Sequence, residues 1–362
     1  MRIVFFCTYY PQYLDFFYKK NKNLKTLSYE EQLNFILNDY SSVWGSYTQK
    51  IRKLGAEVEL IIPNCQPLQS AWAKQNGIKV DSDWYFSIPK KQVKKIQPDV
   101  FFIGSMFEYY GSFLDEIKRI VPNVLGWIAC PIPEKVDVSK LGLIVTSLPK
   151  YVDEFRNMGV NSELLTSAFD TEILNHLETF IEPDIDFSFL GSFTTAHQNR
   201  IKMIKELVDR TPVEIFGTGI KTIPDERPFV QRLFKKNLIQ QRYKGEKWGL
   251  DMFRTLRRSR ITFNVHIDIS GTYAGNIRMF EATGVGTLLV TDGKQSPIRL
   301  FEDDEVIYYN DINEAIDKIN YYLEHEDERK NIAKKGQART LSTYNFDITA
   351  AKMYEYLKSY SR

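Results

Sequence analysis

The sequence has little of several residue types that mark whole classes of protein. Three cysteines in 362 residues are too few and too scattered for a disulfide framework or a zinc site. The 48 Lys and Arg residues nearly balance the 46 Asp and Glu residues, so no strong affinity for nucleic acid follows. We therefore expect reduced thiols in a reducing compartment, and no nucleic-acid partner, for a chain with cysteines at Cys7, Cys65 and Cys130.

Long apolar runs are also missing. No stretch approaches the roughly 18 apolar residues of a membrane span, and residues 2–7 indicate a first β-strand rather than a signal peptide. We expect a cytoplasmic protein. Peripheral contact with the inner face of a membrane stays open, because basic residues are locally dense at Arg254, Arg257, Arg258 and Arg260.

What the sequence does have is a regular alternation of apolar runs and amphipathic segments. This pattern is typical of an α/β fold with a parallel sheet and helices on both faces. Strands are expected at 2–7, 56–63, 98–104, 124–129, 143–146, 163–166, 186–193, 213–219, 261–265, 287–290 and, as an edge strand, within 300–311. Helices are expected after Ser28 and at 42–54, 64–77, 89–97, 111–121, 149–158, 198–209, 246–258, 276–284, 312–323, 326–341 and 347–360.

The alternation stops once, near residues 171–184, and then restarts. We therefore predict two Rossmann-like, doubly wound domains at 1–175 and 185–345, with a C-terminal helix at 346–362 that packs back on the first domain. Two segments are expected to be irregular. Pro11 is taken to keep the aromatic segment after the first strand from being helical at its start, and residues 221–243 are expected to form a loop with one helix.

One stretch, residues 261–292, carries the strongest functional pattern. A buried strand is followed by a polar loop that ends at Gly275, and a short helix opens near Asn276 and stops at Gly284 or Gly286. Strand, Gly-rich loop and helix N-terminus form a phosphate site in open α/β sheets, because free backbone N–H groups and the helix dipole favour an anion. Half of a nucleotide-sugar site is therefore expected here.

Further candidate residues follow other strands. Ligands bind at the carboxyl ends of parallel strands, which selects Gly191 and Ser192 after the first strand of the second domain. His197 and Arg200 lie just beyond and are either phosphate contacts or exposed helix residues. His266 ends a buried strand and is either a ligand contact or a hydrogen-bonded structural histidine.

Several segments of the chain resemble a known family. The C-terminal half resembles the glycosyltransferase domain of spore maturation protein B-type proteins, a branch of the GT-B glycosyltransferases, which carry two Rossmann-like domains across a cleft. The N-terminal half resembles bacterial proteins of this branch that look like surface-glycan enzymes. The matching segments are 189–193, 275–292, 300–309 and 319–341 in the C-terminal half, and TYYPQYLDFFY and NCQPLQSAWA in the N-terminal half.

The resemblance implies roles for residues of the central stretch. Glu281 falls where many retaining GT-B enzymes place the last carboxylate of an E-x7-E motif, which accepts hydrogen bonds from the donor ribose. The motif's first position is Tyr273, so stereochemistry does not carry over. The donor diphosphate would lie near the loop and the helix start, and Tyr243, just before Lys244, would stack on the base. The full set of implied donor residues is Gly191, Ser192, Tyr243, Gly271, Thr272, Tyr273, Gly275, Asn276, Arg278 and Glu281.

The acceptor side is expected in the first domain. That domain has no histidine, so a general base for inverting transfer would be a carboxylate, and Asp15 and Glu108 follow strand ends. With retention of configuration neither is needed. His266 completes the candidate catalytic set. Aromatic residues of the same loops either stack on sugar rings or pack the domain, namely Tyr9, Tyr10, Tyr13, Phe107, Tyr109 and Tyr110.

The leading interpretation is a glycosyltransferase that moves a sugar from a nucleoside-diphosphate donor to a glycan, lipid-linked or protein acceptor, in bacterial surface polysaccharide or glycoconjugate synthesis. No cofactor or metal is expected, because the Asp81 and Asp83 pair lies in an unsuitable turn. Two alternatives stay open: a nucleotide-sugar epimerase on the same fold, and a catalytically silent nucleotide-sugar or glycan-binding partner. The oligomeric state, donor sugar and acceptor are open.

Overall fold

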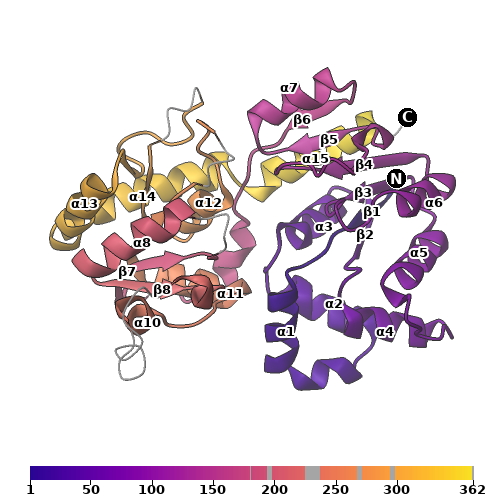
Figure 1. Cartoon of the computed structure of the whole chain (residues 1–362), viewed down its shortest axis with the longest axis horizontal. Helices are drawn as coiled ribbons and strands as arrows, with labels where there is room; N and C mark the ends of the chain where they lie inside the picture. The colour runs from indigo at the N-terminus through magenta and orange to yellow at the C-terminus, as the bar shows by residue number, and fades with distance from the viewer. Residues whose placement is uncertain (180, 194–197, 225–236, 267–270, 294–297, 361–362) are drawn as a thin grey trace. The chain divides into compact units, whose positions relative to one another are not determined.

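The computed structural model describes residues 1–362 apart from 180, 194–197, 225–236, 267–270, 294–297 and 361–362. The chain forms two compact units (Figure 1), residues 1–166 with 346–362, and residues 167–345. Each contains one parallel sheet, as the alternation of apolar and amphipathic segments predicts. Residues 167–175, predicted to lie in the first domain, belong to the second unit, because the Phe169 N–H donates to the Tyr344 carbonyl and its ring packs over Gly284.

The described part of the first unit has a six-stranded sheet in the order β2-β1-β3-β4-β5-β6. Its strands are β1 (Arg2–Phe6), β2 (Glu57–Ile61), β3 (Val100–Ile103), β4 (Asn123–Trp127), β5 (Ile144–Thr146) and β6 (Ser162–Leu164). Its α-helices are α1 (Pro11–Lys20), α2 (Tyr29–Leu37), α3 (Val43–Lys53), α4 (Gln66–Gln75), α5 (Trp84–Ile96), α6 (Ser112–Ile120), α7 (Pro149–Asn157) and α15 (Phe346–Ser359).

The second unit has, in its described residues, a five-stranded sheet in the order β11-β10-β9-β7-β8. The strands are β7 (Ile185–Leu190), β8 (Val213–Phe216), β9 (Ser259–Asn264), β10 (Leu288–Asp292) and β11 (Ile307–Tyr309). The helices are α8 (Gln198–Arg210), α10 (Leu238–Arg242), α11 (Gly249–Arg257), α12 (Ile277–Gly284), α13 (Ile312–Glu324) and α14 (Glu326–Thr343). A 3₁₀-helix, η3 (Thr171–His176), lies in the segment expected to be a linker.

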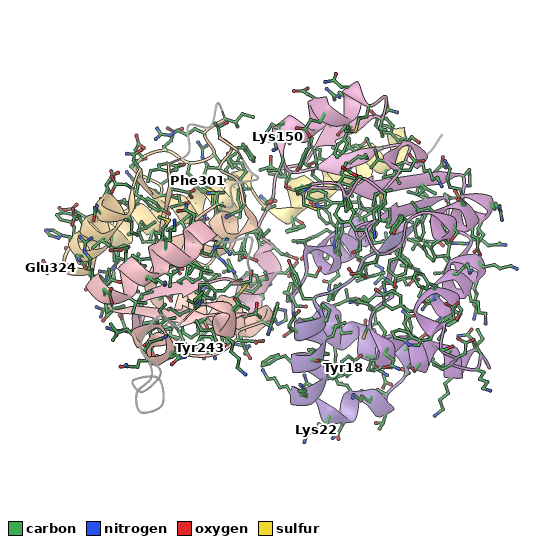
Figure 2. All side chains as sticks on the ribbon, viewed as in Figure 1. Tyr18, Lys22, Lys150, Tyr243, Phe301 and Glu324 are labelled. Carbon is green, nitrogen blue, oxygen red and sulfur yellow. The ribbon has the colours of Figure 1, made fainter. Side chains whose placement is uncertain are left out.

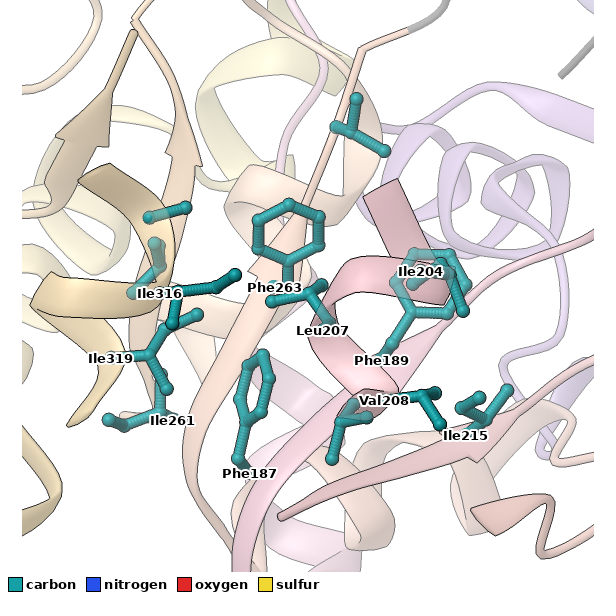
Figure 3. Packing of buried hydrophobic residues seen from close by; sticks show 14 of the residues in the cluster. Phe187, Phe189, Ile204, Leu207, Val208, Ile215, Ile261, Phe263, Ile316 and Ile319 are labelled. Atoms are coloured by element: carbon teal, nitrogen blue, oxygen red, sulfur yellow. The ribbon is translucent and has the colours of Figure 1, made fainter. Parts of the chain in front are cut away.

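The core of the second unit follows from the alternation of side chains along its strands. Phe187 of β7 and Phe263 of β9 face the same side of the sheet, where helices α8 and α13 cover them (Figure 3). The residues between the inward side chains of each strand point to the other face, where Ser188 Oγ donates to Thr262 Oγ1 at 3.1 Å. Close apolar packing on the first face fixes the strand register and hence the position of the strand ends.

The prediction for residues after Pro11 was wrong. They form helix α1, with Pro11 in its first turn. A proline is compatible with that position because the N–H that it lacks would have no acceptor within the helix. Asp15 therefore lies on a helix, where it is exposed, and not in a loop after the first strand.

Helix α5 starts earlier than predicted and contains Pro89. Proline cannot donate the hydrogen bond to the carbonyl four residues back, which here belongs to Tyr85. The Tyr109 hydroxyl donates to that carbonyl instead, at 3.3 Å, and the two tyrosine rings stack with centroids 5.1 Å apart. A side chain from the loop after β3 therefore supplies the hydrogen bond to the Tyr85 carbonyl that the proline cannot donate.

The helix predicted at 246–258 begins later, at Gly249, because the residues before it are extended. Tyr243 forms a parallel bridge with Ile215 of β8, and the Lys244 N–H donates to the Ile215 carbonyl. This segment continues the edge of the sheet beyond β8. Most of the loop predicted at 221–243 lies outside the described residues, which contain helix α10 at its end.

Candidate functional site

The candidate site lies at the carboxyl end of the second sheet. The strand order reverses between β7 and β9, and such a switch point is where open α/β sheets bind ligands. Gly191 and Ser192 follow β7 there, as predicted. A Cβ on Gly217, which has φ +136°, would lie 1.8 Å from the Gly191 carbonyl oxygen. The turns after β7 and β8 therefore touch through their backbones.

Helix α12 begins at this edge with an unusual cap. Asn276 is its N-cap residue, yet the side chain makes no capping hydrogen bond. Its Nδ2 donates instead to Asn264 Oδ1 at 2.9 Å, and Asn264 Nδ2 donates to Thr291 Oγ1 at 2.9 Å. A capping side chain would occupy a first-turn N–H group. Since this one is turned away, it leaves the N–H groups of Ile277 and Arg278 open to an anion. The Met279 N–H donates to the Asn276 carbonyl at 3.2 Å.

His266 lies between the end of β10 and the start of α12. Its Nδ1 is 2.5 Å from Asp292 Oδ1, and its backbone N–H donates to the same carboxylate at 3.1 and 3.2 Å. The Asn276 backbone N–H donates to Nε2 at 3.3 Å. Nε2 is thus an acceptor and Nδ1 carries the proton that faces Asp292. The side chain is 1% exposed, and both ring nitrogens contact residues of the same unit.

Arg200 of α8 brings a guanidinium to the same strand ends. It donates to the Ser192 carbonyl at 2.8 Å and to the Val265 carbonyl at 3.4 Å. Burial lowers its pKa to about 10, with a further decrease from neighbouring Arg278 that Asp292 partly opposes. Among the described residues Arg200 has no carboxylate at ion-pair distance, so a desolvated positive charge faces this edge of the sheet.

Arg278 and Glu281 form a largely buried pair on α12. Arg278 Nη1 lies 2.8 Å from Glu281 Oε2, and the two side chains are 17% and 15% exposed. The contact lacks hydrogen-bond geometry, since Oε2 is buried without a hydrogen-bond donor. Burial raises the pKa of Glu281, and Arg278 offsets that increase only in part. Glu281 therefore pairs with Arg278 and keeps the capacity to accept hydrogen bonds from a ligand.

The loop before α12 is described from Gly271 onward. Gly271, with φ +58°, and Thr272 are exposed, whereas Tyr273 is buried. A Cβ on Gly275 would lie 2.5 to 2.6 Å from two ring atoms and the hydroxyl oxygen of Tyr273. The tyrosine in the motif's first position thus packs on the glycine, which explains the need for glycine there.

Tyr243, labelled in Figure 2, lies beside the β8 turn and is half-buried. Its hydroxyl donates to the Gly217 carbonyl at 2.9 Å, and burial raises its pKa. Lys244 Nζ is 3.7 Å from Glu214. The tyrosine thus lies beside Gly217, which touches the Gly191 turn, and its stacking on a donor base stays a prediction.

The predicted acceptor-side residues lie in the first unit. Glu108, in the loop after β3, is exposed and accepts a hydrogen bond from the Tyr85 hydroxyl. Burial, followed by that contact, raises the pKa of Tyr85 to about 12. Of the aromatic residues expected near the acceptor, Tyr9, Tyr13 and Tyr109 are buried and pack the core, whereas Tyr10 is 70% exposed. His197 lies outside the described residues.

Sequence reasoning missed three members of the site, Asn264, Thr291 and Asp292. Each is a polar residue at the end of a buried strand, the signal that selected His266. The described residues contain no group of three or more His, Cys, Asp or Glu side chains that could hold a metal ion. No helix in the described part of the chain is long and apolar enough to cross a membrane.

Comparisons with known proteins concern part of the chain for the family and the whole chain for the fold. A family model described as glycosyl transferase-like matches residues 198–355. No curated protein matches the chain. Among solved structures, Anabaena HepE in complex with UDP is 12% identical, with a TM-score of 0.58 over 99% of this chain and 100% of that one.

Two other solved structures are similar over the same extent. Sucrose-phosphate synthase from Thermosynechococcus elongatus is 9% identical, with a TM-score of 0.59 and 99% coverage of both chains. An alpha-glucosyltransferase in complex with UDP and DNA is 12% identical, with a TM-score of 0.61, 99% coverage of this chain and 100% of that one. At this identity the likeness concerns the fold: the whole chain has the GT-B fold, and residues 198–355 match a glycosyl transferase-like domain within it.

Proposed function

We propose that this protein is a glycosyltransferase that uses a nucleoside-diphosphate sugar as donor. The observation that carries the proposal is the start of α12, where the Asn276 side chain is turned away from the cap position. The match of residues 198–355 to a glycosyl transferase-like family model supports it. Membership of the spore maturation protein B-like branch is part of the proposal.

The site would stabilise the leaving diphosphate. In transfer, the bond between the anomeric carbon and a diphosphate oxygen breaks while the acceptor oxygen bonds to that carbon, so negative charge grows on the diphosphate. First-turn N–H groups of α12 and the guanidinium group of Arg200 supply fixed positive charge at this edge, and Arg278 adds a guanidinium whose charge Glu281 partly offsets. Preorganised donors of this kind are the main source of rate acceleration in many enzymes.

The same cationic groups lead us to propose that transfer needs no metal ion, since they can neutralise the diphosphate. Activity would then be unchanged after treatment with EDTA. Glu281 would bind the donor ribose, because a carboxylate can accept hydrogen bonds from two vicinal hydroxyls.

The acceptor hydroxyl would be bound in the first unit, where Glu108 is the better placed carboxylate because the Tyr85 hydroxyl orients it. If transfer inverts, the acceptor proton passes to such a carboxylate; if it retains, the departing phosphate oxygen can take the proton. The acceptor class proposed is a glycan, a lipid-linked glycan or a protein.

A thermal-shift panel of UDP-, GDP-, dTDP- and CMP-sugars tests the donor site. A ligand that binds only the native state raises its stability by about 2.7 kcal/mol at 100 times Kd. We expect a shift for one nucleotide class in wild type that is lost in Glu281→Ala and kept in Glu314→Ala, a control at a partly exposed carboxylate of the same unit. UDP is the first choice, since two similar structures are UDP complexes.

The same preparations separate the alternatives. Release of nucleoside diphosphate, by transfer or by slow hydrolysis, identifies a transferase. Formation of an epimer without an acceptor identifies an epimerase, and binding without turnover identifies a silent partner. No shift with any nucleotide overturns the proposed donor site.

A further inference from the structure

We propose that His266 and Asp292 are positioning residues that hold the donor-binding end of helix α12, and that His266 does not touch the substrate. This inference rests on the proposed function, because it assigns a task to residues around the same site. It replaces the expectation that His266 takes part in the chemistry.

Both ring nitrogens of His266 are hydrogen-bonded within the protein. Its Nδ1–H faces Asp292, and its Nε2 accepts the Asn276 backbone N–H. With both nitrogens engaged and the side chain 1% exposed, the ring has no free group for a proton transfer to a substrate. A catalytic base needs a nitrogen within hydrogen-bond reach of the reacting proton.

Asn276 is held at two points, its backbone N–H and its side chain. One relay runs from Asp292 through His266 to the Asn276 backbone N–H. The other runs from Thr291 through Asn264 to the Asn276 side chain. Both start at the end of β10 and pass through residues at or just after the end of β9, so two rigid strands fix one N-cap residue.

The two relays determine the direction in which the first-turn N–H groups of α12 point. Anion binding at a helix start depends on how those groups point. With the Asn276 side chain held by Asn264, the cap cannot fold over them, and with its N–H held by His266, the helix start cannot rotate freely. The two relays thus keep the donor site open before the donor arrives, which lowers the cost of ordering it on binding.

The test compares three variants with a matched control. His266→Leu removes both hydrogen bonds, Asp292→Asn weakens the first relay, and His266→Gln keeps one acceptor and one donor. His325→Leu, at a partly exposed histidine that stacks on Tyr321, is the control. Calorimetry measures the Kd of UDP, and ligand-observed NMR measures the Kd of uridine, which lacks the diphosphate.

We expect His266→Leu and Asp292→Asn to weaken UDP about tenfold, the size of one lost hydrogen bond to a charged group, and uridine less than twofold. His266→Gln should restore UDP affinity to within about threefold, with kcat for turnover of the UDP-sugar nearly unchanged. The control should bind both ligands as wild type does.

Four results would overturn the inference. Equal weakening of UDP and uridine would indicate general damage, and a loss of kcat of about a hundredfold in His266→Gln at unchanged KM would indicate direct catalysis. A ¹⁵N NMR spectrum of ligand-free wild type that shows the proton on Nε2 would contradict the relay itself. Loss of UDP binding in Glu281→Ala but not in His266→Leu overturns this inference alone, whereas a wild type that binds no nucleotide overturns the proposed function with it.

Discussion

Glu281 shows how one buried side chain can serve a site at a cost to the fold. Burial raises the pKa of Glu281 even though Arg278 is adjacent. A carboxyl with a raised native pKa holds its proton more tightly in the folded chain. Its contribution to stability is present below the unfolded-state pKa and is lost as the pH rises through the folded-state pKa. The folded protein is therefore less stable with Glu281 ionised, the form that would bind the ribose, than with Glu281 protonated.

We predict that Glu281→Gln gains stability relative to wild type as the pH rises from about 4 to about 7. Urea unfolding at several pH values measures the difference. Glu314→Gln is a control of opposite sign, because hydrogen bonds from Lys318 and the Asn310 N–H lower the pKa of Glu314. That variant should lose stability relative to wild type only as the pH rises toward the unfolded-state pKa of about 4.3, and the difference should be flat above about pH 5. A difference for Glu281→Gln that is flat with pH would contradict the prediction.

At the scale of an element, helix α5 depends on a contact from outside itself. Pro89 leaves the Tyr85 carbonyl without its helical donor, and the Tyr109 hydroxyl takes that place. The first unit thus joins a helix to the loop after β3, the loop that also carries Glu108. The helix and the loop should respond to mutation as one structure.

We predict that Tyr109→Phe destabilises the protein by about 1 kcal/mol, the usual contribution of one hydrogen bond. The cost should shrink in a Pro89→Ala background, because the substituted alanine can donate its own N–H to the Tyr85 carbonyl. Chemical denaturation of the four proteins gives the coupling energy. Tyr10→Phe, at an exposed tyrosine, is the control and should change stability little. Equal costs of Tyr109→Phe in both backgrounds would rule out the exchange of donors.

The elements also show what the sequence can predict. The helix expected after Ser28 is confirmed as α2, because Ser28 and Glu31, only three residues apart in the sequence, form a capping box at its start. Helix α1 was missed because a proline was taken to oppose a helix when it occupies the first turn. The start of α5 was missed because the group that makes its proline tolerable belongs to Tyr109, twenty residues further along the chain.

The site was also predictable only where the signal lies in neighbouring residues of the sequence. Asn276 and His266 are noticeable as polar residues at a helix start and a strand end. Their partners depend on register: the pairing of β9 with β10 sets Asn264 beside Thr291, and no local pattern gives that alignment. Contacts that join distant segments had to come from the structure.

At the scale of the molecule, the first unit is discontinuous in sequence. Helix α15 follows the second unit along the chain and packs against α3 of the first (Figure 1). Phe346 contacts Tyr47 edge to face with ring centroids 4.9 Å apart, and Lys50 lies 2.9 Å from Asp347. Met353 and Leu357 are fully buried.

We predict that Met353→Ala destabilises the protein by about 2 to 5 kcal/mol, as is usual for a buried large-to-small substitution. Ile348→Ala, at a 50% exposed position of the same helix, should cost less than about 0.5 kcal/mol. Thermal and urea unfolding measure both. Similar small costs for the two variants would show that α15 adds little to the first unit.

The placement of α15 also constrains the order in which the protein can mature during synthesis. Domains generally fold as units while the chain is being made, the N-terminal one first. Here the first unit cannot complete its own packing until residues 346–359 have left the ribosome, after the whole second unit. Until then the face of α3 that carries Tyr47 stays uncovered, and a nascent chain stalled in the second half would present that face to chaperones and proteases. Quality control would therefore sense completion of the second unit through the unfinished surface of the first.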